Sequence, residues 1–362
     1  MLIYYIILAL LAFLGGLELS TRERYLKVYL SLCAVFSMSL LAGLRTANVG
    51  ADYSSYEEIF YNFKGAAESG VQQVLAFDYF FEPGFAFYIV LFKTFFSSSE
   101  GFFFFTALIN CVVLYFSIKK LTPLVLVSLT LYFSYLFFAH ALIAVRYGIA
   151  SAIGLYVLYQ LSSNRYRNAI FYTLVAMTMH TASIVLFAPI LFKALSLGRK
   201  TLIWGFFSSF IMGAAGLGQS IFKLILPGWL PRAESALTYV SSGQYGDSLG
   251  FLGMVNLKNV ALCLLLFCLW RKCDEKYRHF EWLAIFFVLG ASLRLAFHDL
   301  GFIISRMSAF LTLTEVILFP MLMFTIFRWK VLSWVSVCLY AFLNLVMLLH
   351  IRGFAPYESI LF

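Results

Sequence analysis

Four long stretches of the sequence contain no Asp, Glu, Lys or Arg: residues 121–145, 168–192, 201–222 and 331–351. A helix needs about 20 residues to cross a hydrocarbon core of roughly 30 Å, so each stretch is long enough to span a membrane. Because 62% of the residues are hydrophobic and only 12% are charged, water would not keep such a chain dispersed. The sequence therefore predicts an all-α, polytopic transmembrane helical bundle.

Weaker apolar segments add to these four runs, at residues 1–17, 26–44, 84–97, 101–118, 146–162, 251–270, 280–297 and 302–327. Together they predict about ten to thirteen membrane segments, not all of them full spans. The opening run lacks the basic start of a signal peptide, so we interpret it as the first span. Little chain remains for a soluble part, and we expect a single integral membrane domain, 1–362.

Basic residues orient the chain. They gather in six short loops: Arg22, Arg24, Lys27; Lys119, Lys120; Arg165, Arg167; Lys193, Arg199, Lys200; Arg271, Lys272, Lys276, Arg278; Arg328, Lys330. The positive-inside rule assigns all six to the cytoplasm if 80–97 and 168–195 each enter and leave on one side, as a re-entrant segment or a hairpin. If both are single spans, the Lys119 and Arg165 clusters lie outside. These loops explain the net charge of +9, so we expect no nucleic-acid partner.

The favoured orientation leaves a common set of segments outside: 45–84, 139–148, 179–183, 223–250 and 298–306. In the first of them, Asp52 follows a Gly-marked turn and precedes a segment whose positions 53, 56, 59 and 60 share one helical face. Asp52 is either the N-cap of that helix or a catalytic carboxylate, and the two roles are compatible. Arg45, directly after the second span, is either an interfacial residue or a ligand of substrate.

Two further outer segments carry Arg146, His140 and His180 in apolar surroundings. An Arg at the edge of a membrane helix costs about 2.5 kcal/mol or more, and normally faces a cavity or a partner. We favour a phosphate site over a structural ion pair with a residue such as Glu315, because guanidinium is a rigid fork that matches phosphate oxygens. His180 is either a core residue or a functional one at the turn of a hairpin.

Arg294, His298, Asp299 and Arg306 surround a later outer turn. His298 and Asp299 are adjacent and point in different directions, so we do not expect them to form a catalytic dyad. Several arginines, a His and an Asp, without a zinc-like Cys/His spacing or a phosphate-binding Gly loop, suit a large anionic headgroup at the interface, with neither metal nor cofactor. A transporter for an anionic substrate uses similar residues, but usually with broken helices and inverted repeats.

The motifs "LRTANVGADYSSY" after the second span, "FEPGFAFYIVLF" (81–92), "AVRYGIASAI" (144–153) and "MHTASIVLFAPILF" (179–192) together resemble the EpsG family of bacterial exopolysaccharide proteins. That family is grouped with Wzy-type polysaccharide polymerases and, more distantly, with GT-C glycosyltransferases. The resemblance covers roughly the first 200 residues, and beyond them only "ISRMSAF" around Arg306 is similar. The chain departs from the family pattern at Tyr147, where Gln is common, and at Ala51, where Thr is common.

The resemblance implies a GT-C-like bundle with short amphipathic helices in the first outer loop. It also implies a bacterial inner-membrane polymerase that transfers a growing glycan from undecaprenyl pyrophosphate to a sugar hydroxyl of the next lipid-linked unit, at the outer face. The implied partners are this lipid-linked oligosaccharide, as donor and acceptor, the bilayer, and a chain-length regulator protein. A lipid-linked glycan flippase and an O-antigen ligase-like transferase are the alternatives.

In this hypothesis Asp52 is the base that takes the acceptor's proton, and Arg146 and His180 complete the catalytic set. We expect a second set to bind substrate. Its members are Arg45, Tyr53, Tyr56, Glu82, Arg294, His298 and Arg306.

Overall fold

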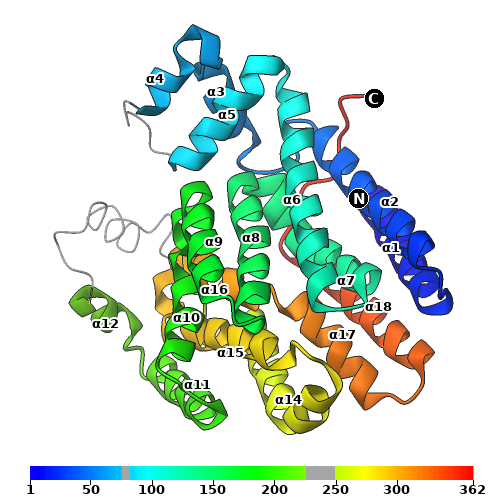
Figure 1. Cartoon of the computed structure of the whole chain (residues 1–362), viewed down its shortest axis with the longest axis vertical. Coiled ribbons are helices and arrows are strands. Elements are labelled where there is room, and N and C mark those ends of the chain that lie inside the picture. The colour runs from blue at the N-terminus through cyan, green and yellow to red at the C-terminus, as the bar shows by residue number, and fades with distance from the viewer. Residues whose placement is uncertain (76–81, 226–248, 362) are drawn as a thin grey trace. The chain divides into compact units, whose positions relative to one another are not determined.

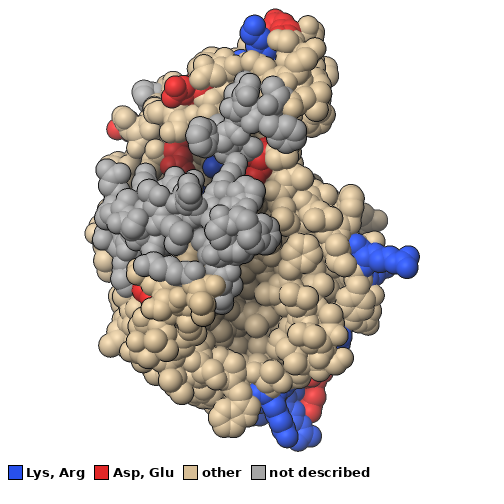
Figure 2. Space-filling model, turned by 90° about the vertical axis from the view of Figure 1, so that its left-hand side faces the viewer, with Lys and Arg blue, Asp and Glu red and all other residues tan. Residues whose placement is uncertain are grey.

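The computed structural model describes residues 1–75, 82–225 and 249–361. These ranges contain α-helices, short 3₁₀ and π turns and one isolated β-bridge, with no β-strand. Six of the helices are long and apolar enough to cross a membrane, and uncharged side chains make up most of the surface visible in Figure 2. The prediction of an all-α polytopic membrane bundle is confirmed. Asp78 and much of the predicted outer segment 223–250 lie outside the described residues.

The chain divides into two compact units, residues 1–183 with 316–362, and residues 184–315 (Figure 1). The first unit contains α1 (Leu2–Ser20), α2 (Arg24–Gly43), α3 (Tyr53–Asn62), η1 (Ala66–Glu68), α4 (Gly70–Leu75), α5 (Pro83–Phe95), α6 (Ser99–Leu121), α7 (Val125–Phe137), η2 (Phe138–Ile143), α8 (Val145–Ser162), α9 (Tyr166–Met179), α18 (Lys330–Val346) and η5 (Met347–Ile351). The second contains α10 (Phe187–Ala194), α11 (Arg199–Ala214), α12 (Gly218–Ile225), α14 (Met254–Lys276), α15 (Phe280–Ala296), η4 (His298–Leu300) and α16 (Gly301–Thr312). The chain passes between the units at η3 (Thr181–Leu186) and at α17 (Glu315–Ile326). The prediction of one integral membrane domain stays a prediction.

Helix α7 lies at the centre of the first unit. It is the most buried of the six long helices and packs against α1 and α18, while α6 packs against α2 and α8. The carboxylate of Glu18, at the end of α1, accepts the amides of Val125 (2.9 Å), Leu126 (3.0 Å) and Val127 (3.3 Å). These amides have no partner within their own helix, so a buried acid from α1 satisfies the start of α7.

Only some of the ten to thirteen predicted membrane segments are long enough to be full spans, as expected. The described residues contain six candidate spans, or seven if the bent pair Ile303–Thr312 and Glu315–Ile326 counts as one. Segment 80–97 contains α5, which has 13 residues and reaches about 20 Å at 1.5 Å per residue, too short for a hydrocarbon core. Segment 168–195 is broken at His180, between α9 and η3. The sequence could not show which of the predicted segments are full spans, because apolar composition does not fix where a helix ends.

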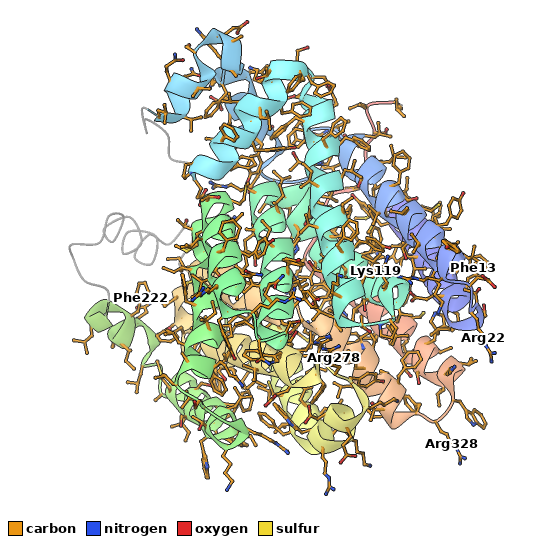
Figure 3. All side chains as sticks on the ribbon, in the orientation of Figure 1. Phe13, Arg22, Lys119, Phe222, Arg278 and Arg328 are labelled. Carbon is orange, nitrogen blue, oxygen red and sulfur yellow. The ribbon has the colours of Figure 1, made fainter. Side chains whose placement is uncertain are left out.

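Short helices occupy the loop between α2 and α5, as predicted for this loop. Helices α3 and α4 and the turn η1 lie between α2 and α5. Tyr53, Tyr56 and Phe60 are the buried face of α3, and they pack with Phe85 and Phe102 in an aromatic cluster. Within the first unit, the labelled basic residues Arg22, Lys119 and Arg328 lie at the helix ends remote from α3 and α5 (Figure 3).

Candidate functional site

Three motifs that are far apart in the sequence meet in the first unit. Glu82 is the N-cap residue of α5, Arg146 lies in the first turn of α8, and His180 is the C-cap residue of α9. Each therefore sits at a helix end, where side chains and backbone groups outside the regular hydrogen-bond ladder are available. The π turn η2, which precedes α8, belongs to a class of irregular turns that is frequent at functional sites.

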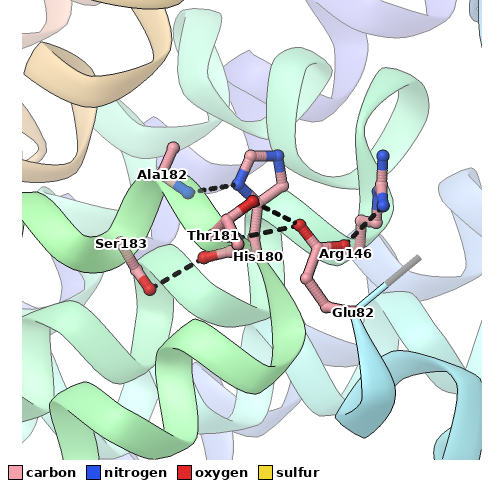
Figure 4. A network of polar contacts seen from close by, with 6 residues as sticks. All are labelled: Glu82, Arg146, His180, Thr181, Ala182 and Ser183. Carbon is pink, nitrogen blue, oxygen red and sulfur yellow. Dashed lines mark hydrogen bonds and ion pairs between the residues drawn. The ribbon is translucent and has the colours of Figure 1, made fainter. Parts of the chain in front are cut away.

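An ion pair joins two of these residues. Arg146 Nη1 lies 2.5 Å from Glu82 Oε2, and the other carboxylate oxygen accepts the backbone amide (2.9 Å) and hydroxyl (2.8 Å) of Thr181 (Figure 4). Glu82 is 5% exposed and the Arg146 side chain 19%. The carboxylate is thus fixed from two sides, and Arg146 is the more accessible partner. The suggested partner of Arg146, Glu315, instead pairs with Lys258 at 2.8 Å within the second unit.

Electrostatics keep Glu82 charged. Burial alone would raise the pKa of Glu82, but Arg146, the hydrogen bonds from Thr181 and the nearby His180 together lower that pKa below its ordinary value. At neutral pH the site therefore holds a carboxylate and a guanidinium.

His180 is buried beside this pair. Its Nδ1 accepts the amide of Ala182 (3.2 Å), so a neutral ring carries its proton on Nε2. The ring of His180 lies edge-on to that of Tyr147, with 5.3 Å between the ring centroids. The Tyr147 ring also lies edge-on to that of His140 of η2, with 5.1 Å between the centroids. Tyr147, where the family commonly has Gln, thus lies between two imidazoles. The sequence showed that Tyr147 departs from the family pattern, but it could not predict that Tyr147 contacts both histidines.

Glycines allow these helix ends to approach closely. A Cβ on Gly84 would lie 2.4 Å from Thr178 Oγ1 and 2.8 Å from the Thr178 carbonyl oxygen, so only Gly lets α5 pack against the end of α9. Gly50 has φ of +111°, and a Cβ there would lie 2.0 Å from the carbonyl oxygen of Leu142. The loop before Asp52 is therefore packed directly onto η2.

Asp52 occupies the N-cap position of α3, but its side chain makes no capping hydrogen bond. Its backbone carbonyl accepts the amide of Tyr56 at 3.0 Å, and the residue is half-buried. The capping interpretation of its carboxylate is therefore wrong. Its assignment as the base stays a prediction.

Three residues expected to contact substrate are part of the protein core. Arg45 is fully buried, with its guanidinium 4.6 Å from the Phe103 ring and 5.1 Å from the Tyr53 ring. It donates to the carbonyl oxygens of Val49 (3.1 Å) and Ala42, and burial lowers its pKa to about 10. Tyr53 stacks on Phe103, and Tyr56 lies edge-on to Phe85. Because all three side chains are buried and already have partners within the protein, we withdraw them from the substrate-binding set.

The later cluster lies in the second unit. Arg294 donates to Asn256 Oδ1 and Ser305 Oγ, both at 3.1 Å, and Arg306 of α16 is half-buried. His298 Nε2 lies 3.1 Å from the Gly213 carbonyl oxygen, while Asp299 accepts the Gln219 amide at 2.7 Å. His298 and Asp299 thus have different partners, as expected for residues that do not form a dyad.

The sequence did not indicate three residues that bind the candidate charged groups: Thr181, Asn256 and Lys258. Thr181 is a common residue type directly after His180, and Asn256 and Lys258 lie 38 and 57 residues from their partners Arg294 and Glu315. Sequence proximity therefore gave no signal for these pairings. The local indications were Asn256 and Lys258 themselves, two polar residues in the first turns of a helix whose middle is apolar.

The model of the EpsG family matches residues 28–361, most of the chain. The chain is 28% identical over 311 residues to the amylovoran biosynthesis protein AmsC of Erwinia amylovora, which covers 84% of this chain and 81% of that protein. No solved structure matches.

Proposed function

The chain belongs to the EpsG family, and from this premise we propose that it polymerises lipid-linked oligosaccharide units in exopolysaccharide synthesis. Its similarity to a protein of amylovoran biosynthesis supports a polysaccharide product. The six candidate spans suit a substrate that is anchored in the bilayer by its lipid.

The proposed reaction is glycosyl transfer. A hydroxyl oxygen of the acceptor sugar bonds to the anomeric carbon of the donor, and the bond from that carbon to the pyrophosphate oxygen breaks. Undecaprenyl pyrophosphate leaves with the bonding electrons, and the hydroxyl proton passes to the Asp52 carboxylate. The developing negative charge on the leaving group requires a fixed positive group.

The ion pair between the half-buried Arg146 and the buried Glu82 is the observation that carries the proposal. Arg146 lies in the first turn of α8, where the helix dipole also favours an anion. Glu82 is held by Thr181 independently of Arg146, so it orients the guanidinium while Arg146 remains the more accessible partner. We assign Arg146 to the pyrophosphate, His180 to a phosphate oxygen or the acceptor, and Glu82 to orienting Arg146.

Sidedness within the first unit agrees with catalysis at the outer membrane face. The loops containing Arg22 and Arg328, and the end of α6 with Lys119, lie remote from α3 and α5 (Figure 3). The positive-inside rule favours a cytoplasmic location for these basic residues, and this supports an outer location for α5 and its N-cap Glu82. We propose the bacterial inner membrane, with the site open to the periplasm or exterior.

Purified protein in lipid, given undecaprenyl-pyrophosphate-linked oligosaccharide, tests the function directly. We expect the wild type to make a ladder of chain lengths on a gel, Arg146→Ala to make none, and Arg167→Ala to match the wild type. Arg167 is the control because it is an exposed arginine of α9. Absence of a ladder from folded wild-type protein would refute the polymerase proposal, and a normal ladder from Arg146→Ala would remove that residue from it.

A further inference from the structure

The C-terminal residues 354–361 lie along the loop that joins α2 to α3. Thr46 N donates to the Glu358 carbonyl oxygen and Ile360 N to that of Leu44, both at 3.0 Å. These bonds form an antiparallel bridge between Arg45 and Ser359. Segments about 310 residues apart in sequence are thus joined through their backbones.

Side chains extend this contact in both directions along the loop. Glu358 Oε2 accepts Asn48 Nδ2 at 2.6 Å and Thr46 Oγ1 at 3.2 Å. The Tyr357 hydroxyl donates to the Leu41 carbonyl oxygen at 3.1 Å, in the last turn of α2. Residues 41–48 therefore have successive partners on the C-terminal segment.

The later part of the same loop is fixed against η2 and α6. Gly50 packs against the Leu142 carbonyl oxygen, and Arg45 reaches from the bridge to Val49 while its guanidinium lies over Phe103. Asp52 follows Gly50 by two residues, and Arg146 follows Leu142 by four. The loop is thus held between the C-terminal segment and the turn that leads into the candidate site.

We propose that the C-terminal segment 354–361 positions Asp52 for the reaction, with Glu358 as a positioning residue. The inference rests on the proposed function, in which Asp52 takes the acceptor proton. That transfer requires hydrogen-bond reach, and a displacement of about 1 Å can cost about a hundredfold in rate. Loosening the segment therefore lowers kcat, while KM, which reflects groups elsewhere in the site, changes little.

A proline at position 360 tests the backbone contact, because it removes the amide that donates to Leu44. We expect Ile360→Pro to lower kcat about tenfold or more with KM within about twofold. Ile360→Ala keeps the amide and is the matched control, with kcat expected to stay near wild type. Equal kcat values in the two variants would overturn the positioning role.

Exchanging the amide of Asn48 and the carboxylate of Glu358 tests Glu358 without disturbing the backbone. Asn48→Asp places a second carboxylate against Glu358 and should lower kcat. Adding Glu358→Gln should restore kcat, since the side-chain amide at position 358 can then donate to the carboxylate at position 48. A merely destabilising change at position 48 would not be rescued in this way. Failure of the rescue would remove Glu358 from the positioning role.

Amide hydrogen exchange of residues 44–53 gives a readout that does not need activity. We expect faster exchange there in Ile360→Pro than in wild type or Ile360→Ala. Unchanged exchange would overturn the inference even if polymer is made. A wild type that makes no polymer would refute the proposed function and the catalytic role of the segment, whereas faster exchange would still demonstrate the contact.

Discussion

Glu82 depends on Arg146 to balance its charge. We therefore expect the loss of Arg146 to destabilise the protein more when Glu82 is present than when Glu82 has been replaced by Gln. Arg146→Ala leaves a buried carboxylate without its cation and should reduce the free energy of unfolding by about 2–4 kcal/mol. Glu82→Gln in the same chain removes that charge while keeping an oxygen acceptor for Thr181, and should recover part of the loss. Thermal unfolding of the purified variants measures both effects. A double variant less stable than Arg146→Ala would contradict the pairing.

The lowered pKa of Glu82 predicts a pH dependence with a definite sign. Because the folded pKa lies below the ordinary value of 4.5, the charged site stabilises the folded state above about pH 4.5. This contribution is lost as the pH falls through the folded pKa. We therefore expect the difference in unfolding temperature between wild type and Glu82→Gln to narrow below pH 4.5. A difference that stays constant from pH 7 to pH 4 would show that Glu82 titrates normally.

Sequence reasoning identified which residue types matter at the candidate site, but not how they pair. Arg146 and His180 stood out because charge or titratable groups are rare in the apolar runs around them. Glu82 lies 64 residues from Arg146 and resembled the other acids of the first outer loop. Only the fold distinguishes it from Glu315, which pairs with Lys258. Likewise, the sequence could not indicate that Arg45, Tyr53 and Tyr56 would be covered by aromatic rings.

At the scale of elements, Gly50 determines how the loop between α2 and α3 packs against η2. Gly50→Ala would bring a Cβ to 2.0 Å from a carbonyl oxygen, in a backbone conformation with φ of +111°. We expect a loss of roughly 2–4 kcal/mol in unfolding free energy, from strain and overpacking together. Gly205→Ala in α11 is the control, since that position has no atom within 4 Å and Ala favours helix. Equal stability of the two variants would show that the loop readily moves away.

The sequence predicted the apolar helices better than their ends. The expected segments 1–17, 26–44 and 101–118 correspond to α1, α2 and α6, because uninterrupted hydrophobicity favours one long helix. The run 168–192 contains no charge, yet the helix stops at His180, and the chain also turns at Asn164 (φ +57°) and Ser196 (φ +52°). The turns at Asn164 and Ser196 lie in the polar basic loops that the sequence marks, whereas the extended backbone of His180 ends α9 inside an uncharged run. Composition therefore predicted that these segments are apolar helices, but it did not predict how long each helix is.

At the scale of the whole molecule, the two compact units have the same apolar, helical character. A boundary between soluble domains is usually marked by a polar or Pro/Gly-rich linker. Here the chain crosses between units at η3 and α17, within segments that read as continuous hydrophobic runs. The division could therefore not be predicted from composition.

The proposed polymerase role predicts where lipid-linked units accumulate in cells that lack the protein. A polymerase acts after lipid-linked units have crossed the membrane, so its loss should leave single units on the outer face. Loss of a flippase would leave them on the cytoplasmic face. Oxidation of spheroplasts with membrane-impermeant periodate, followed by extraction of lipid-linked sugars, distinguishes the two distributions.

The Arg146→Ala variant should reproduce the outer accumulation, because it removes the proposed pyrophosphate ligand while the spans and basic loops stay intact. Arg167→Ala should give normal polymer, because that side chain is exposed on α9 and has no place in the site. Protection of the accumulated units from periodate in both the deletion strain and Arg146→Ala would instead identify an exporter. The Arg146–Glu82 pair would then belong to a translocation path, since a half-buried cation at a helix end can bind the same pyrophosphate during transport.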